Sequence, residues 1–206
     1  MHATGHPLPR CTEFATLFDD PSQWEVFASG QSEGHLSRIK GPDGAPGIRF
    51  DYNFHGGGGF VVIRRVVPLT MPGTFEIGFW VRGEGPCNNF EFKVAAPGGA
   101  DVWRHLKQAC QLPDAWGDYR FTERELPFAW GPAGGGPPSQ IEAIEFVIAA
   151  GPGGQGVLEL SSAHLEDQTL RYPQSISASS HLPAHPPELA FDDEKETEWI
   201  AATNDP

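Results

Sequence analysis

Residues 75–132 read FEIGFWVRGEGPCNNFEFKVAAPGGADVWRHLKQACQLPDAWGDYRFTERELPFAWGP. From Phe75 to Arg82, apolar side chains of one parity alternate with polar, small or aromatic ones, a period of two that is typical of a strand with one buried face. The alternation returns between Phe90 and Val94, after a turn at 83–86. Two further runs follow, one around Trp103 and one over 116–126. This stretch therefore predicts four short strands, which carry nine of the 23 aromatic residues.

The rest of the chain repeats this organisation. The 25 glycines and 20 prolines fall between alternating apolar runs and form no repeat, which favours many turns and few helices. Short strands at such spacings are typical of sandwiches and jelly rolls. We therefore predict an all-β fold, a β-sandwich of the jelly-roll type. The further predicted strands lie at 24–27, 35–40, 48–54, 60–67, 141–150 and 157–165.

The chain length sets the domain organisation. At 206 residues the chain is long enough for one full domain and part of another, since domains usually have about 100 to 150 residues. We expect a lead-in over 1–16, a jelly-roll domain over 17–168, and a linker with the incomplete start of a second domain over 169–206.

The charge of the chain excludes two kinds of partner. The formal net charge is −13 and no cluster of Lys or Arg offsets it, so nucleic acid and anionic membrane surfaces are repelled. No segment has the length and apolarity of a membrane span. The N-terminal residues MHATGHPLPRC lack the charged region and apolar run of a signal peptide. We expect no nucleic-acid partner and no membrane span.

The cysteines and the absence of known catalytic motifs indicate no specific reaction or metal site. Cys11, Cys87 and Cys110 are an odd number without CxxC spacing, which predicts neither a disulfide framework nor a zinc site. A single bridge between Cys87 and Cys110 stays open. The chain has no HExxH, G-x-S-x-G, Walker or dinucleotide-binding motif, and its strand carboxylates are explained by solvated faces. We predict no catalytic residue in this chain.

Several tryptophans raise the question of a ligand surface. Trp80 and Trp103 share the parity of charged neighbours, which fits either a second packed layer or a platform for stacking. Both roles stay open for Trp103 and Trp116, whereas Trp24 and Trp130 are expected in the core. A platform suits a sugar, whose apolar C–H face lies on an aromatic ring while planar polar side chains bind its hydroxyl groups.

Adjacent carboxylates precede the first predicted strand. Asp19 and Asp20 suit a hard cation such as calcium, which prefers oxygen ligands. The alternative is that these aspartates are solvated or cap a turn.

The order of the motifs resembles a known family of modules. The motifs are LFDD-x-x-x-W, IRFDY, FEIGFWVRG, NNFEFKV, FAWGP, IEFVIA and VLEL, over about residues 17–166. They resemble the β-jelly-roll carbohydrate-binding modules of bacterial glycoside hydrolases, especially family 11 and its galactose-binding-like relatives.

The resemblance implies a non-catalytic module that binds an oligo- or polysaccharide. Its partner would be the catalytic domain of a longer bacterial chain, a glycoside hydrolase, and its location secreted or periplasmic. It also implies a structural calcium ion held by Asp19 or Asp20 together with Glu159. The tyrosine platform of family 11 is not reproduced one for one, which leaves the sugar open. The candidate sugar-binding residues are Trp80, Arg82, Asn89, Trp103, Trp116 and Tyr119.

A second resemblance lies in residues 172–206. The pattern S-A-S-S, then Ala190-x-Asp192-Asp193, then Thr197-x-Trp199 resembles the opening of a coagulation-factor type C (discoidin) domain, with Asp193 in place of the usual glycine. This resemblance implies calcium ligands at Asp192 and Thr197. The pattern covers only the start of such a domain, so we expect the chain to be part of a longer multidomain protein.

Two alternatives from other classes stay open. One is a small hydrolase in its own right, which would require two carboxylates facing each other across a cleft. The other is non-catalytic. The sandwich would be a structural spacer or protein-interaction domain that packs on a catalytic domain and binds no sugar. It predicts an apolar patch on one sheet face and no open groove.

Overall fold

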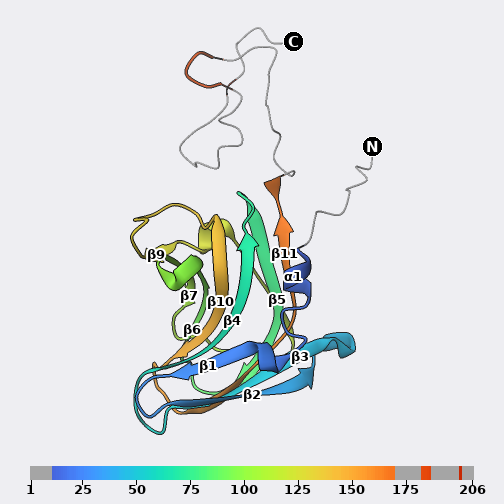
Figure 1. Cartoon of the computed structure of the whole chain (residues 1–206), viewed down its shortest axis with the longest axis vertical. Coiled ribbons are helices and arrows are strands. Elements are labelled where there is room, and N and C mark those ends of the chain that lie inside the picture. The colour runs from blue at the N-terminus through green and yellow to red at the C-terminus, as the bar shows by residue number, and fades with distance from the viewer. Residues whose placement is uncertain (1–10, 170–181, 187–199, 201–206) are drawn as a thin grey trace. The chain divides into compact units, whose positions relative to one another are not determined.

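The computed structural model describes residues 11–169, 182–186 and 200. The chain divides into two compact units after Asp167, and the strands belong to the first (Figure 1). The strands are β1 (Trp24–Ala28), β2 (Glu33–Lys40), β3 (Pro46–Asn53), β4 (Phe60–Thr70), β5 (Phe75–Glu84), β6 (Asn89–Ala95), β7 (Val102–Lys107), β8 (Gly117–Thr122), β9 (Phe128–Trp130), β10 (Gln140–Ala149) and β11 (Gln155–Asp167).

Helices in the described residues are short. Among residues 11–169, the only α-helix is α1 (Thr12–Ala15), and no helix of the described residues is long and apolar enough to cross a membrane. The single-turn 3-10 helices are η1 (Pro21–Gln23), η2 (Pro42–Gly44), η3 (Pro97–Gly99) and η4 (Glu123–Glu125).

The strands form two antiparallel sheets. Sheet A has the order β2-β3-β11-β5-β8, and sheet B has the order β1-β4-β10-β6-β7-β9. Every neighbouring pair is antiparallel. Because each strand alternates, one face of each sheet turns its apolar side chains to the other sheet. The expected all-β jelly-roll sandwich is confirmed.

The core between the sheets is rich in phenylalanine. Phe146 on β10 of sheet B meets Phe79 on β5 of sheet A, with ring centroids 5.2 Å apart and planes at 85°. Phe92 on β6 packs edge-on to the same Phe146 ring at 5.2 Å. Such edge-to-face contacts add about 0.5–1.5 kcal/mol beyond the area that the rings bury. The alternation in 75–82 and 90–94 thus correctly predicts that Phe79 and Phe92 lie in the core.

The described part of the expected lead-in, 11–16, and the residues that follow it up to β1 pack on this core. Phe14 of α1 is buried, and the backbone N–H of Cys11 donates to the carbonyl of Leu165 at 3.1 Å. Trp24 is buried as expected, stacks on Phe18 and donates its indole N–H to the carbonyl of Leu17 at 3.2 Å. The apolar residues at 14, 17 and 18 are therefore anchors of the fold.

Candidate functional site

The outer face of sheet A carries a row of charged side chains that crosses the strands. Glu159 on β11 lies directly opposite Arg49 on β3 and Arg82 on β5. Arg49 donates from Nη1 to Glu159 Oε1 at 3.3 Å, and Arg82 donates from Nε to Glu159 Oε2. Glu159 is only 6% exposed, so its charge is offset by two guanidinium groups and not by water.

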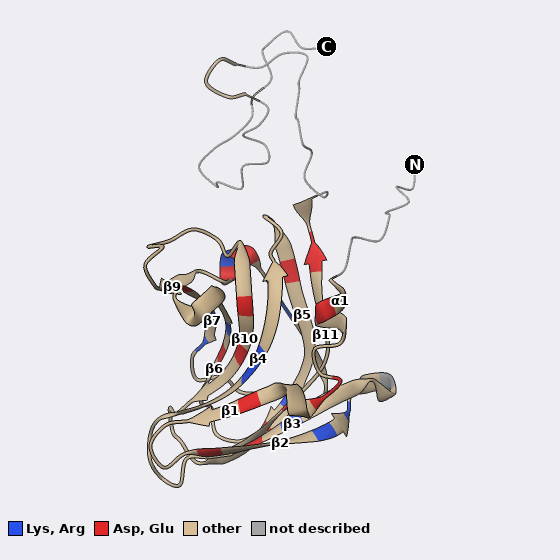
Figure 2. Ribbon diagram, in the orientation of Figure 1, with Lys and Arg blue, Asp and Glu red and all other residues tan. Residues whose placement is uncertain are grey.

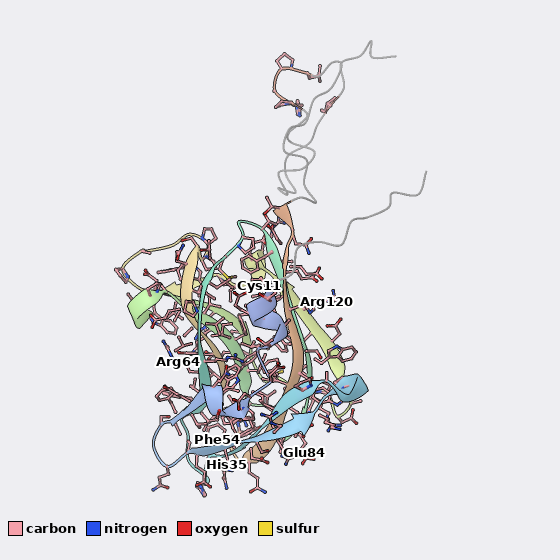
Figure 3. All side chains as sticks on the ribbon, turned by 45° about the vertical axis from the view of Figure 1, so that its right-hand side comes forward. Cys11, His35, Phe54, Arg64, Glu84 and Arg120 are labelled. Carbon is pink, nitrogen blue, oxygen red and sulfur yellow. The ribbon has the colours of Figure 1, made fainter. Side chains whose placement is uncertain are left out.

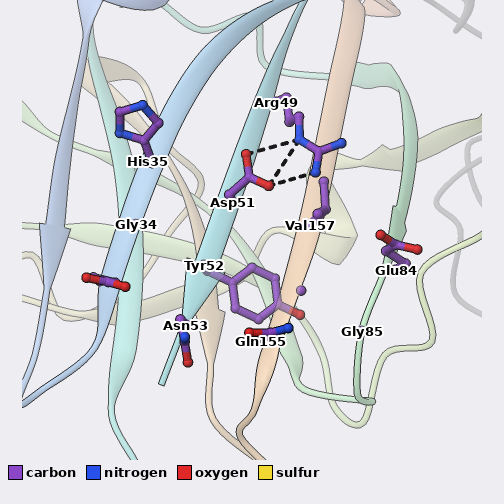
Figure 4. Close-up of a pocket in the computed structure, with 12 residues that line it drawn as sticks. Gly34, His35, Arg49, Asp51, Tyr52, Asn53, Glu84, Gly85, Gln155 and Val157 are labelled. Carbon is purple, nitrogen blue, oxygen red and sulfur yellow. Dashed lines mark hydrogen bonds and ion pairs between the residues drawn. The ribbon is translucent and has the colours of Figure 1, made fainter. Parts of the chain in front are cut away.

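A large hollow lies beside this row. It has a volume of about 810 Å³ and lies over β2, β3, β11 and the end of β5 (Figure 4). Inside it, Arg49 donates from Nη2 to Asp51 Oδ1 at 2.7 Å and from Nε to both oxygens at 3.0 Å. These hydrogen bonds raise the pKa of the Arg49 guanidinium. The polar side chains that line the hollow are those of Glu33, His35, Arg49, Asp51, Tyr52, Asn53, Glu84 and Gln155.

A smaller hollow of about 200 Å³ continues the first. The two share Arg49, Glu84 and Val157 as lining residues, so they form one groove, which we call the sheet A groove. Asp114 enters the lining from the connection between β7 and β8. This connection lies along β5 because the backbone N–H of Gly83 donates to the carbonyl of Pro113 at 2.8 Å.

Three predicted sugar-binding residues lie together at the β5–β8 side of this face. The guanidinium carbon of Arg82 lies 4.7 Å from the centroid of the Trp116 ring, a cation–π contact. Trp80 lies two residues before Arg82 on β5, opposite Ser161 on β11 and Asp118 on β8. Both tryptophans are partly exposed. The structure therefore brings Trp80, Arg82 and Trp116 together.

The other three predicted residues lie elsewhere. Asn89 is on β6 of sheet B, where its side-chain oxygen accepts from the backbone N–H of Ala109 at 3.0 Å. Trp103 is 5% exposed in the core and donates its indole N–H to the carbonyl of Gly136 at 2.6 Å. Two roles were open for Trp103, a stacking platform and a core residue, and the structure shows a core residue. Asn89 and Trp103 are therefore on sheet B, whereas the groove is on sheet A.

Tyr119 points inward from β8. Its ring stacks on Phe79 with centroids 5.3 Å apart, and its hydroxyl lies 2.8 Å from Nε2 of the buried His105. Burial raises the pKa of the Tyr119 hydroxyl and lowers the pKa of His105. The sequence contained a signal for this placement, because Tyr119 has the same parity as the buried Phe121.

The expectation that Trp130 is a core residue is wrong. Its side chain is 47% exposed on the short edge strand β9. Lys93 Nζ lies 5.4 Å and the guanidinium carbon of Arg104 lies 5.9 Å from the Trp130 ring centroid. The bulge between β7 and β9 places Trp130 on the outer face of sheet B, with these two cations.

Two of the expected calcium ligands, Asp20 and Glu159, have other partners. Asp20 caps η1 by accepting from the backbone N–H of Ser22 at 3.0 Å, and forms an ion pair with Arg38 at 3.6 Å. Glu159 faces two guanidinium groups, which does not fit a calcium ligand. Within the described residues, no group of three or more His, Cys, Asp or Glu could hold a metal ion. Asp192, Thr197 and the discoidin-like pattern lie outside the described residues, and calcium binding by Asp19 or Asp20 stays a prediction.

The cysteines are separate thiols in the structure. Cys87 donates from Sγ to the side-chain oxygen of Gln111 at 3.0 Å, and the backbone N–H of Cys110 donates to the carbonyl of Asn88 at 2.8 Å. Burial raises the pKa of Cys110. The Cys87–Cys110 bridge that the sequence left open is not formed here.

Sequence reasoning missed most of the groove. Arg49 and Asp51 alternate with the buried Ile48, Phe50 and Tyr52, so parity alone places them on an outer face. Their connection to Glu84 and Asp114 depends on which strands are neighbours, and local sequence carries no such information.

No family model matches the sequence, and no curated protein matches it either. Solved structures do resemble the chain. The family 11 carbohydrate-binding module of the cellulosomal cellulase Lic26A-Cel5E of Clostridium thermocellum has a TM-score of 0.59 and 14% sequence identity, over 79% of this chain and 96% of that one.

Two more structures show the same likeness. A family 11 module from Clostridium thermocellum in complex with a β-1,3-1,4-mixed-linked tetrasaccharide has a TM-score of 0.58 and 16% identity, over 72% of this chain and 91% of that one. A carbohydrate-binding module structure of the β-sandwich superfamily, solved to explain promiscuous specificity, has a TM-score of 0.51 and 13% identity, over 79% of this chain and 63% of that one. The first unit of the chain therefore has the β-sandwich fold of the family 11 carbohydrate-binding modules.

Proposed function

We propose that this chain is a non-catalytic carbohydrate-binding module and that an oligo- or polysaccharide lies in the sheet A groove. The observation that carries the proposal is the contact between Arg82 and Trp116 at the border of an open polar hollow. The fold supports it, because one solved structure with this fold holds a mixed-linked tetrasaccharide.

The chemistry of the groove suits a sugar. A pyranose ring has an apolar C–H face, which packs on an aromatic ring, and hydroxyl groups, which need polar partners. Trp80 and Trp116 supply ring surface at the β5–β8 side. Arg82 uses Nε for Glu159, and within residues 11–169 no hydrogen bond engages its terminal nitrogens. Those N–H groups are donors that Glu159 and Trp116 already hold in place, which lowers the entropy cost of binding.

The register of the strands suggests how a chain of sugars would lie. Arg49, Glu159 and Arg82 form a line perpendicular to the strands, and Trp116 extends it towards β8. Neighbouring strands are spaced by about 4.8 Å, so the five strands of sheet A span roughly 19 Å. We infer that a glycan crosses the strands and contacts several of them.

The finer sequence expectations belong to this proposal. The catalytic domain of a longer bacterial glycoside hydrolase would be the partner, and the secreted or periplasmic space its location. The discoidin-like pattern at 172–206 and its calcium ligands Asp192 and Thr197 would belong to a following module.

One observation favours the alternative of a protein-interaction sandwich. In the first unit, the exposed large apolar side chains among the described residues all lie on sheet B strands: Val26, Phe27, Phe60, Val66 and Trp130. The alternative also predicts that no open groove is present, and the sheet A groove disagrees with that. Carbohydrate binding therefore remains the better supported function.

Affinity gel electrophoresis and calorimetric titration test the proposal. The ligands are mixed-linkage β-glucan oligosaccharides and a panel of other soluble polysaccharides. We expect retardation by at least one of them, and a loss of about tenfold or more in affinity for Trp116→Ala or Arg82→Ala. Trp130→Ala is the matched control, because it removes a tryptophan from the opposite sheet. A folded protein that no glycan retards would shift the function to the protein-interaction sandwich.

A further inference from the structure

The sheet A groove holds more negative than positive charge. Its two hollows are lined by five carboxylates and two guanidinium groups. The chain as a whole has a net charge of −13, and acidic segments lie on strands of both sheets (Figure 2). The carboxylates of the groove are Glu33, Asp51, Glu84, Asp114 and Glu159, and the guanidinium groups are Arg49 and Arg82.

Three of these carboxylates have side-chain partners. Asp51 accepts from Arg49, and Glu159 accepts from both arginines. Glu33 lies 2.8 Å from Nε2 of His55. Both arginines of the groove therefore already pair with carboxylates on their own sheet.

Glu84 and Asp114 have no such partner. Within residues 11–169, no hydrogen bond or ion pair engages either carboxylate, and both border the smaller hollow. Glu84 ends β5 and lies across the larger hollow from His35 (Figure 4; the same two residues are labelled in Figure 3). Asp114 is two residues before Trp116, so both carboxylates are close in sequence to the Arg82–Trp116 contact.

This arrangement sets the charge of a suitable ligand. A uronic acid or sulfated sugar would bring further negative charge to carboxylates that already lack a partner. A neutral sugar would remove water from Glu84 and Asp114 and return only hydroxyl hydrogen bonds. A protonated amine returns charge-assisted hydrogen bonds, which are roughly twice as strong as neutral ones. An ammonium group is also attracted to the face of a tryptophan ring.

We propose that the sheet A groove prefers glycans with protonated amino groups, and that Glu84 and Asp114 are the residues that determine this specificity. The inference rests on the proposed function, because it concerns the same groove. It adds the class of ligand: a polysaccharide built of amino sugars that are free of acetyl groups. Neither carboxylate is buried, so the preference is moderate and depends on salt.

A matched pair of ligands tests the preference. Glucosamine oligosaccharides and their fully N-acetylated counterparts of equal length are titrated calorimetrically at mildly acidic pH. We expect the free amine form to bind about five- to tenfold more tightly at low salt, with most of the difference lost at about 1 M salt, where the Debye length is about 3 Å. An oligomer of uronic acid should bind more weakly than either.

Two variants separate the groove from the overall negative charge. The double variant Glu84→Gln, Asp114→Asn should reduce the difference between the two ligands to about twofold or less. The control Glu25→Gln removes a carboxylate from β1 of sheet B and should leave that difference as it is. If the double variant keeps the full preference for the amine, the carboxylates do not determine it and the inference fails.

The outcomes also distinguish this inference from the proposed function. Equal or tighter binding of the N-acetylated or another neutral glycan overturns the amino-sugar preference and leaves the carbohydrate-binding module in place. Absence of binding to every glycan, charged or neutral, overturns both.

Discussion

Arg82 on β5 and Glu159 on β11 lie opposite each other in the antiparallel register, and the guanidinium Nε donates to the carboxylate Oε2. The same Glu159 accepts from Arg49 on the other side, and the same Arg82 lies on the Trp116 ring. One almost buried carboxylate therefore fixes two arginines and, through one of them, an aromatic ring. Under the proposed function, Glu159 would act as a positioning residue, because it holds Arg82 and Arg49 in place.

The change Glu159→Gln tests this role. It keeps the size of the side chain but removes the charge, so two guanidinium groups lose a charge-assisted partner. We expect the free energy of unfolding to fall by about 1–3 kcal/mol, measured by urea denaturation. We also expect sugar affinity to fall about tenfold, because Arg82 is no longer held over Trp116.

Glu145→Gln provides the control for Glu159→Gln. Glu145 accepts from Arg64 at 2.7 Å on the outer face of sheet B, so this change breaks a comparable ion pair far from the groove. It should lower stability without a loss of affinity. Equal affinity in the wild type and the Glu159→Gln variant would contradict the positioning role.

Substitution of Trp103 and substitution of Trp116 should have different effects on stability and affinity, although the sequence left the same two roles open for both residues. Trp103→Ala removes a buried ring and its hydrogen bond to Gly136, and we expect a loss of about 3–5 kcal/mol in unfolding free energy. Trp116→Ala removes a partly exposed ring and one cation–π contact, and should cost about 1 kcal/mol or less. Affinity measured on folded protein should fall for Trp116→Ala, whereas the milder Trp103→Phe should leave it unchanged. A reversal of this order would show that the two placements are wrong.

Asn88 joins two loops at the end of the sandwich. Its side-chain oxygen accepts from the backbone N–H groups of Gly151 and Gly153 at 3.0 Å each, and its Nδ2 donates to the carbonyl of Gly153 at 3.0 Å. Asn88→Ala leaves these groups without partners in a buried place, so we expect a loss of about 2–4 kcal/mol in urea denaturation. The neighbouring Asn89→Ala removes one hydrogen bond at an exposed site and should cost about 1 kcal/mol or less. Similar losses for both would argue against the joining role of Asn88.

Parity in the sequence predicted the layers well, because each strand buries one face. Phe79 and Trp80 are adjacent in sequence, yet one enters the core and the other lies on the outer face, as the alternation indicates. The same rule placed Tyr119 with Phe121, but we took an aromatic side chain on a strand as a ligand platform and gave its parity too little weight.

Long-range relationships could not be predicted. Arg82 and Glu159 are 77 residues apart, and their contact depends on β11 lying between β3 and β5. The bulge in β11 is another example. Register shifts between Ser161 and His164, where Ser162 has φ of 50°, and the buried parity changes from Leu160 to Leu165. That change is visible in the sequence only once the bulge is known.

His105 gives a prediction for the pH dependence of stability. Its Nδ1 lies 2.8 Å from the carbonyl of Glu125 and its Nε2 lies 2.8 Å from the Tyr119 hydroxyl. A carbonyl only accepts, so Nδ1 carries a proton, and in the neutral imidazole Nε2 then accepts from the Tyr119 hydroxyl. The ring also stacks on Phe121, with centroids 4.4 Å apart. Burial lowers the pKa of His105 in the folded chain, so below the unfolded value of about 6.5 the unfolded chain binds more protons.

The contribution of His105 to stability is therefore complete above about pH 6.5 and is lost as the pH falls through the lowered pKa of the folded state. His105→Gln isolates this contribution, because the amide offers a donor and an acceptor to the same two partners but does not titrate. We expect the variant to be less stable than the wild type at about pH 7.5 and the difference to narrow towards about pH 5. Urea denaturation of both proteins across this range measures the difference. Parallel curves would mean that His105 takes up its proton equally in the folded and unfolded chain, contrary to its buried hydrogen bonds with Glu125 and Tyr119.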